Sequence, residues 1–273
     1  MPDVTVVVPT HDRPADLERA VASVRRQTFP AAAIVVVDDT GSAEAVAGRL
    51  GVRYVRVASH TAGASRNRGA RHADTSHLAF LDDDDEWAPT FLERLLAAGG
   101  DLAAAWTWYQ RGGHRRPGCT LPRRLRAADC LHHNPGLTGS NFVVRTAAFR
   151  ALRGFDPALI VNNDLDLLVR ALDAGLHHVV VAERLVVQHS RGHGHLSSRG
   201  PHRASGLALY RDKYRDRLTL AQRRFLARER YVALKFPGQR PARRAAFALL
   251  GWLNASPRQL AELALHRTAP FYD

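Results

Sequence analysis

The sequence predicts an α/β fold in which a Rossmann-like, mostly parallel sheet is flanked by helices. From residue 5 to about residue 100, short β-branched runs alternate with helical segments, and the links between them are short. This alternation is typical of parallel sheets that are covered on both faces. The runs are apolar throughout, as expected for strands buried on both sides. With 45% hydrophobic and 24% charged residues, the composition is that of an ordinary globular protein.

Each element of the first half follows from a local signal. Pro14 and Pro89 each open a helix, because the first helical position needs no backbone N–H. Leu17, Val21 and Val24 recur at helical spacing and predict one buried face. Further short helices are expected after residues 42 and 64. The predicted strands cover residues 5–8, 34–37, 52–57 and 78–81.

The second half is less regular. Residues 111–130 are rich in Gly, Pro and Arg and predict a mobile loop. Asn163 is a good N-cap for a helix over residues 164–174, and Gly175 follows its end. After Gly192 the chain is expected to be helical, with a capping box at residues 256–259. Strands are expected at residues 102–109, 141–145, 179–181 and 185–187, and a short helix at residues 146–152.

Several classes of protein are disfavoured by the composition. The longest apolar stretches, near residues 102–106 and 245–253, are shorter than the about 20 residues that cross a bilayer. The first ten residues have no basic start and already alternate into a strand, so we expect no signal peptide. Cys119 and Cys130 form neither a disulfide framework nor a CxxC pair, which favours a reducing cytoplasm.

The net charge of +13 is concentrated in the C-terminal segment. Residues 191–273 hold 17 Lys and Arg against 5 Asp and Glu, whereas residues 1–190 hold 22 against 21. Such a tail can meet phosphates on a nucleotide, on nucleic acid or on an anionic membrane. A solvated helical surface rich in arginine is the alternative.

Carboxylates follow two of the predicted strands directly. Asp38 and Asp39 end the strand at residues 34–37, and the run DDDDE at residues 82–86 follows the strand at residues 78–81. Ligands of open parallel sheets bind outside the carboxyl ends of the strands. Adjacent acids repel one another, and hard oxygen ligands suit Mg²⁺ or Mn²⁺ together with substrate phosphates. The run therefore indicates a divalent cation with a nucleotide or sugar diphosphate. A solvated acidic turn is the alternative.

Four motifs occur in a fixed order and spacing: VVVPTHDRPADLERAVASVRRQTF, IVVVDDT, GASRNRGA and FLDDDDEW. Together they resemble the family-2 glycosyltransferases of the GT-A fold. A later segment, GSNFVVRTAAFRALRGFDPALIVNNDLDLLVRALDAG, resembles the acceptor-side half of that family. The resemblance implies a catalytic domain at residues 1–190, with a nucleotide-binding half at about 1–110 and an acceptor half at about 111–190. Residues 191–273 form a basic helical extension outside the resemblance.

The resemblance implies a metal-dependent, inverting transfer of a hexose-type sugar from a nucleoside-diphosphate sugar to an acceptor hydroxyl. Asp39 is expected at the base edge with Asp38 beside it, and Arg66 at the base or a phosphate. The DxD element would be Asp82 and Asp84, with Asp84 on Mn²⁺ or Mg²⁺. The adjacent Asp83 and Asp85 leave this register open by one residue. The expected nucleotide-binding residues are Pro9, Thr10, Arg13, Asp38, Asp39, Arg66, Asp82 and Asp83.

Asp164 is the predicted catalytic base. It matches the second acid of the family's ED-like motif, written here with Asn163 in place of Glu. A helix N-terminus favours an ionised carboxylate, and one carboxylate under the anomeric carbon suffices for a single inverting displacement. Asp166 is the rival base, and a purely structural helix-capping role is the alternative for Asp164.

His189 is expected as an additional metal or diphosphate contact, by its order along the chain. With His193 and His195 it forms an H-x3-H-x-H cluster, but no cysteine or matching spacing supports a zinc site. Residues 138–141 are expected near the donor sugar or the acceptor. Trp106, Trp108 and Tyr109 either stack on a sugar or an apolar acceptor or belong to the core.

The acceptor is open between a small molecule, a glycan and a lipid-linked sugar, and the donor base between uridine, thymidine and guanosine. The protein is expected in the cytoplasm, without a nucleic-acid partner. Residues 245–253 are expected to dock on the catalytic domain, with a dimer interface or peripheral contact with an anionic membrane as alternatives. The loop at residues 111–130 is expected to order over the donor as a lid.

Two other classes remain as alternatives. A sugar-phosphate nucleotidyltransferase would carry a Gly-rich signature after the first strand, and PTHDRPADL has no glycine. A non-enzymatic nucleic-acid binder fits the charge of the tail alone, away from any recognised nucleic-acid motif.

Overall fold

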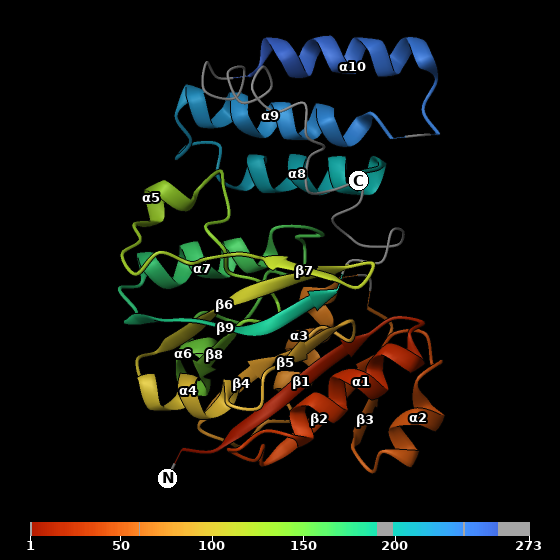
Figure 1. The fold of residues 1–273 in the computed structure, drawn as a ribbon. Helices are drawn as coiled ribbons and strands as arrows, with labels where there is room; N and C mark the ends of the chain where they lie inside the picture. The colour runs from red at the N-terminus through yellow and green to blue at the C-terminus, as the bar shows by residue number, and fades with distance from the viewer. Residues whose placement is uncertain (1, 60, 190–198, 237, 256–273) are drawn as a thin grey trace. The chain divides into compact units, whose positions relative to one another are not determined.

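A computed structural model describes residues 2–59, 61–189, 199–236 and 238–255. The described residues divide into two compact units (Figure 1). The first unit takes in the described residues up to Cys130, residues 134–157 and residues 163–189. The second unit takes in residues 131–133, residues 158–162 and the described residues from Arg199 onward.

Within the described residues, the first unit holds one nine-stranded sheet in the order β3-β2-β1-β4-β8-β6-β9-β5, with β7 paired to β6. The strands β3, β2, β1 and β4 are parallel neighbours, as predicted. The sheet becomes mixed where β8 runs antiparallel between β4 and β6. The strands are β1 (Val4–Thr10), β2 (Ala33–Asp38), β3 (Arg53–Arg56), β4 (His77–Phe80), β5 (Asp85–Trp87), β6 (Leu102–Arg111), β7 (His114–Pro117), β8 (Phe142–Arg145) and β9 (His178–His189).

The central strand β1 is buried on both faces, as its apolar sequence predicts. Val4, Val6 and Val8 join a core with α1 (Pro14–Arg25) and α4 (Phe91–Ala98). Val7 points to the opposite face, where α3 (Ala62–Ala70) approaches so closely that a Cβ on Gly69 would collide with it. The alternation of side chains follows from the two-residue period of a strand. The close approach of α3 to Val7 requires glycine at position 69. The short helix α2 (Glu44–Arg49) lies between β2 and β3 along the chain.

Phenylalanine side chains pack on the same face of the sheet as Val7. Phe80 of β4 lies with its ring centroid 5.2 to 5.6 Å from Phe142, Phe149 and Phe155. Phe149 belongs to α6 (Thr146–Ala151), and Phe155 precedes α7 (Asn163–Asp173). These aromatic contacts tie β4, which leads into the acidic run, to the helices of the later half of the chain.

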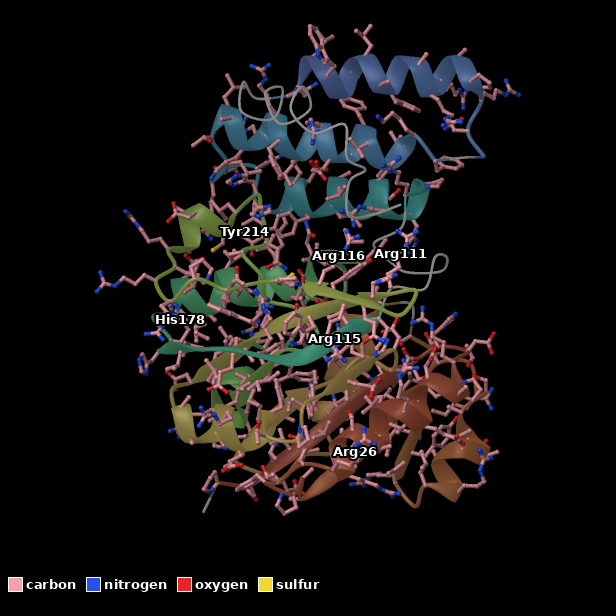
Figure 2. The ribbon with its side chains drawn as sticks, viewed as in Figure 1. Arg26, Arg111, Arg115, Arg116, His178 and Tyr214 are labelled. Atoms are coloured by element: carbon pink, nitrogen blue, oxygen red, sulfur yellow. The ribbon has the colours of Figure 1, made fainter. Side chains whose placement is uncertain are left out.

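Three elements differ from the sequence predictions. The predicted mobile loop at residues 111–130 contains β7, which forms a hairpin with β6, and the short helix α5 (Ala127–Cys130). Arg111, Arg115 and Arg116 extend from this hairpin (Figure 2). The two strands predicted at residues 179–187 are one strand, β9, whose pairing with β6 shifts register near Trp106. The end of the acidic run itself forms β5.

The described residues of the second unit form three helices, α8 (Pro201–Lys213), α9 (Leu220–Leu234) and α10 (Pro241–Leu253). In Figure 1 they lie in succession, with α9 in contact with both α8 and α10. Ala204, Leu207 and Ala233 pack with Val161 in the core of this unit. None of the described helices combines the length and the apolarity that a membrane crossing requires. The capping box predicted at residues 256–259 lies outside the described residues.

Candidate active site

The carboxyl ends of the parallel strands bring the first predicted site residues together. Pro9 and Thr10 end β1, and Thr10 is in register with Asp38 at the end of β2. Thr10 Oγ1 donates to Asp83 Oδ2 at 2.8 Å. Arg13 Nη1 donates to Asp83 Oδ1 at 3.2 Å and to Asp84 Oδ2 at 2.9 Å. The PTxxR segment is thus fixed to the acidic run by hydrogen bonds.

The acidic pair after β2 divides into an internal and an accessible carboxylate. Asp38 is fully buried and accepts from the Thr40 and Ala43 N–H groups at 2.9 and 2.8 Å and from the Tyr54 hydroxyl at 3.1 Å. Burial opposes ionisation, but these hydrogen bonds outweigh it and hold the pKa of Asp38 below its ordinary value. Asp38 therefore closes the turn after β2.

Asp39 is the accessible member of that pair. Its Oδ1 lies 2.6 Å from His11 Nδ1, and His11 is largely exposed. Asp39 is half-buried at the rim of the sheet, a position from which a carboxylate can reach a ligand. Of the two acids, Asp39 is therefore the one that remains accessible to a ligand.

The acidic run is not a solvated turn, because Asp83, Asp84 and Asp85 are all buried. Burial, and then the charge of Asp84, raises the pKa of Asp83 to about 6, although Thr10 and Arg13 act in the opposite direction. Burial and the charges of Asp84 and Asp82 raise the pKa of Asp85 well above its ordinary value. The arginine contacts therefore leave a concentration of negative charge at this edge.

Ser140 connects the acidic run to the segment before β8. Its hydroxyl donates to Asp85 Oδ2 at 2.6 Å and accepts from the Asp82 N–H at 3.0 Å. Its carbonyl accepts from Trp87 Nε1 at 2.7 Å. Ser140 and Asn141 are completely buried. Ser140 and Asn141 belong to the segment 138–141 that was predicted to contact the sugar. Their side chains instead form hydrogen bonds in the interior and support the site.

Arg66 occupies the centre of the candidate site. This buried guanidinium forms an ion pair with Asp82, donates to Asn163 Oδ1 at 3.3 Å and lies 5.4 Å from the Phe155 ring centroid. Its Nε has no hydrogen-bond partner among the described residues. A Cβ on Gly139 would collide with the guanidinium. Arg66 therefore joins the acidic run to α7, and its buried Nε makes no hydrogen bond to any described residue.

The first turn of α7 distinguishes the two candidate bases. Asp164 is partly exposed, and its Oδ1 accepts from the Leu165 N–H at 2.7 Å. Burial raises the pKa of Asp164 to about 6; the charge of Asp82 adds to this effect, and the Arg66 charge opposes it. Asp166 is completely buried and forms a 2.8 Å ion pair with Arg170. The geometry therefore favours Asp164 over its rival.

His189 lies at the end of the acidic run. Its Nε2 lies 2.8 Å from Glu86 Oε1, and Glu86 also pairs with Arg19 at 3.1 Å and with Arg26 at 3.7 Å (Arg26 is labelled in Figure 2). The contact with Glu86 fixes one ring nitrogen of His189. The other two histidines of the predicted cluster, His193 and His195, lie outside the described residues.

Among the described residues no three acids, histidines or cysteines are gathered as a ready-made metal cage. The donor set nevertheless fits Mg²⁺ or Mn²⁺, because hard carboxylate oxygens cluster at the strand ends. Such ions usually take one or two carboxylates and complete their shell with substrate phosphates and water. Asp82, Asp84 and His189 are the candidate ligands.

Trp106 and Trp108 stack on an arginine of the neighbouring strand. The Arg184 guanidinium lies 5.5 Å from the Trp106 ring centroid and 5.3 Å from that of Trp108. Trp106 Nε1 donates to the Leu121 carbonyl at 3.1 Å. This partly buried stack packs β6 against β9, with a cation on one face of each ring.

Besides Thr10 and Arg13, two more side chains hold the acidic run in place, and sequence reasoning did not assign them this role. Ser140 is one, and Arg19, which donates to the Asp84 carbonyl at 2.9 Å, is the other. Arg19 lies on α1, whereas Arg13 precedes that helix, and no local pattern in the sequence pointed to the contact of Arg19 with the Asp84 carbonyl. Ser140 offered no local signal, since both its partners lie more than 50 residues away.

The chain matches the family described as Glycosyl transferase family 2 over residues 5–153, more than half of its length. It therefore belongs to that family, as the ordered motifs predicted. A curated relative is validoxylamine A glucosyltransferase of Streptomyces hygroscopicus subsp. limoneus, 37% identical over 120 residues. That match takes in 38% of this chain and only 25% of the relative's length.

Solved structures support the fold over nearly the whole chain. TarS 1-349 of S. aureus in complex with UDP-GlcNAc has a TM-score of 0.62 at 16% identity, covering 97% of this chain and 76% of that one. The mannosyltransferase PcManGT of Pyrobaculum calidifontis, in complex with GDP-Man and Mn²⁺, has a TM-score of 0.61 at 18% identity, covering 97% and 81%. The predicted GT-A α/β fold is thereby confirmed.

Proposed function

We propose that this chain transfers a hexose-type sugar from a nucleoside-diphosphate sugar to an acceptor hydroxyl, with inversion at the anomeric carbon. The observation that carries the proposal is the single cluster in which Arg66 joins Asp82 of the acidic run to Asn163, next to Asp164. Family membership and the bound nucleotide sugars of the two related structures support the same chemistry.

The nucleotide would bind along the carboxyl ends of β1, β2 and β4. Asp39 would read the base edge, and Asp38 would hold the turn that presents it. Arg66 would face a phosphate, because its guanidinium, held between Asp82 and Asn163, is a planar fork of donors at the site. The other residues proposed for this role are Pro9, Thr10, Arg13, Asp82 and Asp83.

Asp84 would hold Mn²⁺ or Mg²⁺, with His189 as a further ligand, and Asp83 or Asp85 is the alternative if the DxD register shifts by one residue. A divalent cation bound there neutralises negative charge on the departing diphosphate. Arg66 adds a fixed positive charge to the same leaving group. The Mn²⁺ in the mannosyltransferase structure supports this proposal for the fold.

Asp164 would act as the general base. The acceptor oxygen forms its bond to the anomeric carbon as its proton passes to the Asp164 carboxylate, and the bond from that carbon to the diphosphate oxygen breaks. Both electrons of the broken bond leave with the nucleoside diphosphate. A pKa of about 6 leaves Asp164 ionised at neutral pH yet more basic than an ordinary aspartate.

The proposed domain boundaries are residues 1–190 for the catalytic domain and residues 191–273 for the basic extension. We expect the acceptor to be a small molecule, a glycan or a lipid-linked sugar, and the protein to work in the cytoplasm or at a membrane surface.

A thermal-shift panel of UDP, dTDP and GDP, with and without Mn²⁺, tests the proposal most directly. We expect one base to stabilise the protein clearly, more strongly with Mn²⁺ than with EDTA, and Asp39→Asn to weaken that preference. Asp74→Asn is the matched control, because Asp74 is an exposed carboxylate outside the site. Stabilisation by none of the three, together with no turnover of their sugar conjugates, would contradict the proposal.

A further inference from the structure

The last described helix, α10, exposes large apolar side chains to solvent. Leu249 and Trp252 are each 58% exposed and Leu253 is 52% exposed. Their spacing of three and four residues places them on one face of the helix. Its other face meets α9, where Phe247 stacks on Tyr231 at 6.3 Å and Gly251 is buried. A large exposed apolar face of this kind marks an interaction surface.

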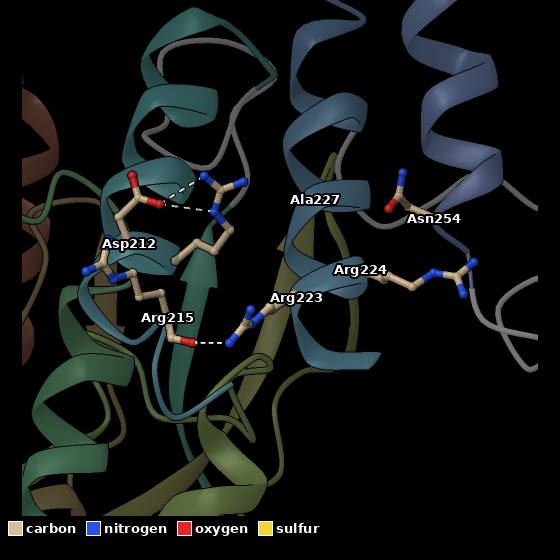
Figure 3. Close-up of a pocket in the computed structure, with 7 residues that line it drawn as sticks. Asp212, Arg215, Arg223, Arg224, Ala227 and Asn254 are labelled. Atoms are coloured by element: carbon tan, nitrogen blue, oxygen red, sulfur yellow. Dashed lines mark hydrogen bonds and ion pairs between the residues drawn. The ribbon is translucent and has the colours of Figure 1, made fainter. Parts of the chain in front are cut away.

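A cavity of about 370 Å³ opens within the same unit and is lined by arginines (Figure 3). Arg215 is largely exposed, and its partner Asp216 is even more so. The Arg211 guanidinium contacts Asp212, the one acid in the lining. The lining residues are Arg211, Asp212, Arg215, Arg223, Arg224, Ala227 and Asn254.

The cavity and the apolar face meet at the end of α10. Arg224 Nη2 donates to the Leu253 carbonyl at 2.8 Å, and Asn254, the next residue, lines the cavity. Leu220, which is 74% exposed, stands one helical turn before Arg223 and Arg224 on α9. The arginine cavity and the apolar helix face therefore adjoin at the C-terminal end of α10.

The charge around this surface is strongly positive. Residues 199–255 contain 14 Lys and Arg against 3 Asp and Glu. Arg243 and Arg244 are exposed in the first turn of α10. An apolar helix face bordered by arginines has the composition of a helix that lies in the headgroup region of a bilayer. Anionic headgroups attract each nearby Lys or Arg by about 1 kcal/mol.

We propose that this unit docks on an anionic phospholipid bilayer, with Leu249, Trp252 and Leu253 in the acyl boundary and the arginine cavity around a lipid phosphate. A second copy of the chain is a poorer occupant, because a two-fold contact would bring the same arginines face to face. Nucleic acid would satisfy the arginines but would leave the leucines exposed to water.

Co-sedimentation with vesicles tests the proposal without nucleotide or acceptor, so its outcome is independent of the proposed glycosyl transfer. The full chain is expected to bind phosphatidylcholine vesicles containing phosphatidylglycerol, and to bind pure phosphatidylcholine at least tenfold more weakly. Arg211→Ala with Arg215→Ala should lower the partition coefficient about 25-fold, at about fivefold for each charge. Arg49→Ala is the control, an arginine of comparable exposure in the first unit.

The apolar contribution has a separate readout. Trp252 emission should shift to shorter wavelength with anionic vesicles, and Trp252→Phe should abolish the shift while binding persists. Leu249→Ser with Leu253→Ser should weaken binding at least tenfold with an unchanged melting temperature. Equal binding to neutral vesicles, or full binding by both double variants, would overturn the proposal.

Three further outcomes would also overturn it. If inorganic phosphate at millimolar concentration releases the protein from vesicles, the cavity is a site for the free anion. Tight binding to duplex DNA that is lost in the arginine variant and kept in the leucine variant would indicate nucleic acid. A dimer in sedimentation velocity that the leucine variant abolishes, without vesicle binding by either protein, would indicate a second copy.

Discussion

Asp164 differs from Asp166, two residues further along α7, in what surrounds it. Asp166 is completely buried against Arg170, whose guanidinium also holds the Leu152 and Gly154 carbonyls. Asp164 is partly exposed and has a raised pKa. The local environment, and not residue type, thus separates a candidate base from a structural acid.

Replacing Asp164 with Asn should remove the proton acceptor and keep the shape of the site. We expect kcat to fall by about 10²–10⁴-fold with little change in nucleotide affinity. Steady-state kinetics together with calorimetric titration of the nucleoside diphosphate would measure both. Asp74→Asn serves as the control, and an Asp164→Asn enzyme that retains kcat would exclude Asp164 as the base.

The raised pKa of Asp164 predicts an acid limb in the pH profile. The carboxyl must lose its proton to act as a base, so kcat should rise with pH and level off above about 6. Asp83 also has a pKa of about 6, but it is proposed to act in nucleotide binding. Nucleotide affinity measured over the same pH range separates the two effects. A kcat that stays constant from pH 5 to pH 8 would contradict the assignment.

At the scale of elements, the turn before β8 sets the position of Arg66. Gly139 faces the guanidinium so closely that a methyl group there would collide with Arg66 and lie 3.0 Å from Asp82 Oδ2. The ordinary φ of Gly139 shows that space, and not backbone conformation, requires glycine at this position.

Gly139→Ala should therefore displace Arg66 from Asp82. We expect a loss of stability of about 1–3 kcal/mol, as overpacking usually gives, and at least tenfold weaker nucleotide binding. Gly48→Ala in α2 is the control, because its new methyl group would meet no atom within 4 Å. Denaturant melts and titrations of both variants would check this, and equal behaviour of the two would show that the Arg66–Asp82 pair tolerates the methyl group.

Ser140 gives a second test at this scale. Its removal leaves the Asp82 N–H and the Asp85 carboxyl without their hydroxyl partner in the interior. Ser140→Ala should lower the free energy of unfolding by about 1–3 kcal/mol, and urea denaturation would measure it. Ser42→Ala, at an exposed turn, is the control. A change below 0.5 kcal/mol would show that the hydroxyl does not anchor the run.

The sequence predicted the elements whose signal is local. The parallel strands, their acidic ends and the helix at residues 163–173 follow from apolar runs, prolines and caps. The strand β5 was missed because it pairs with β9, which is distant in the sequence. The pairing of β6 with β7 is local, and the Gly112–Gly113 turn between them was a hairpin signal within the segment predicted as a mobile loop. The contact of Arg66 with Asn163 spans 97 residues and leaves no local pattern. The order of the motifs therefore predicted which residues lie together at the candidate site. Which of their carboxylates remain accessible depends on long-range contacts that the sequence does not show.

At the scale of the whole molecule, the acidic edge should respond to removal of divalent cations. Burial, and then the charges of the neighbouring acids, raise the pKa values of Asp83 and Asp85, and a divalent cation would favour their ionised forms. We expect EDTA to reduce turnover at least 100-fold and Mn²⁺ or Mg²⁺ to restore it. An activity assay with a calcium control would check this, and full activity in EDTA would contradict metal dependence.

The end of the acidic run pairs with β9, the last of the described strands along the chain. β5 begins at Asp85 and, among the described strands, pairs with β9 alone, which ends at His189, whereas the family match ends at residue 153. During synthesis, the nascent chain therefore lacks the partner of this edge until residues 186–188 have left the ribosome. A fragment cut at the family boundary would expose an unpaired strand beside its acids, and such an edge is prone to aggregation.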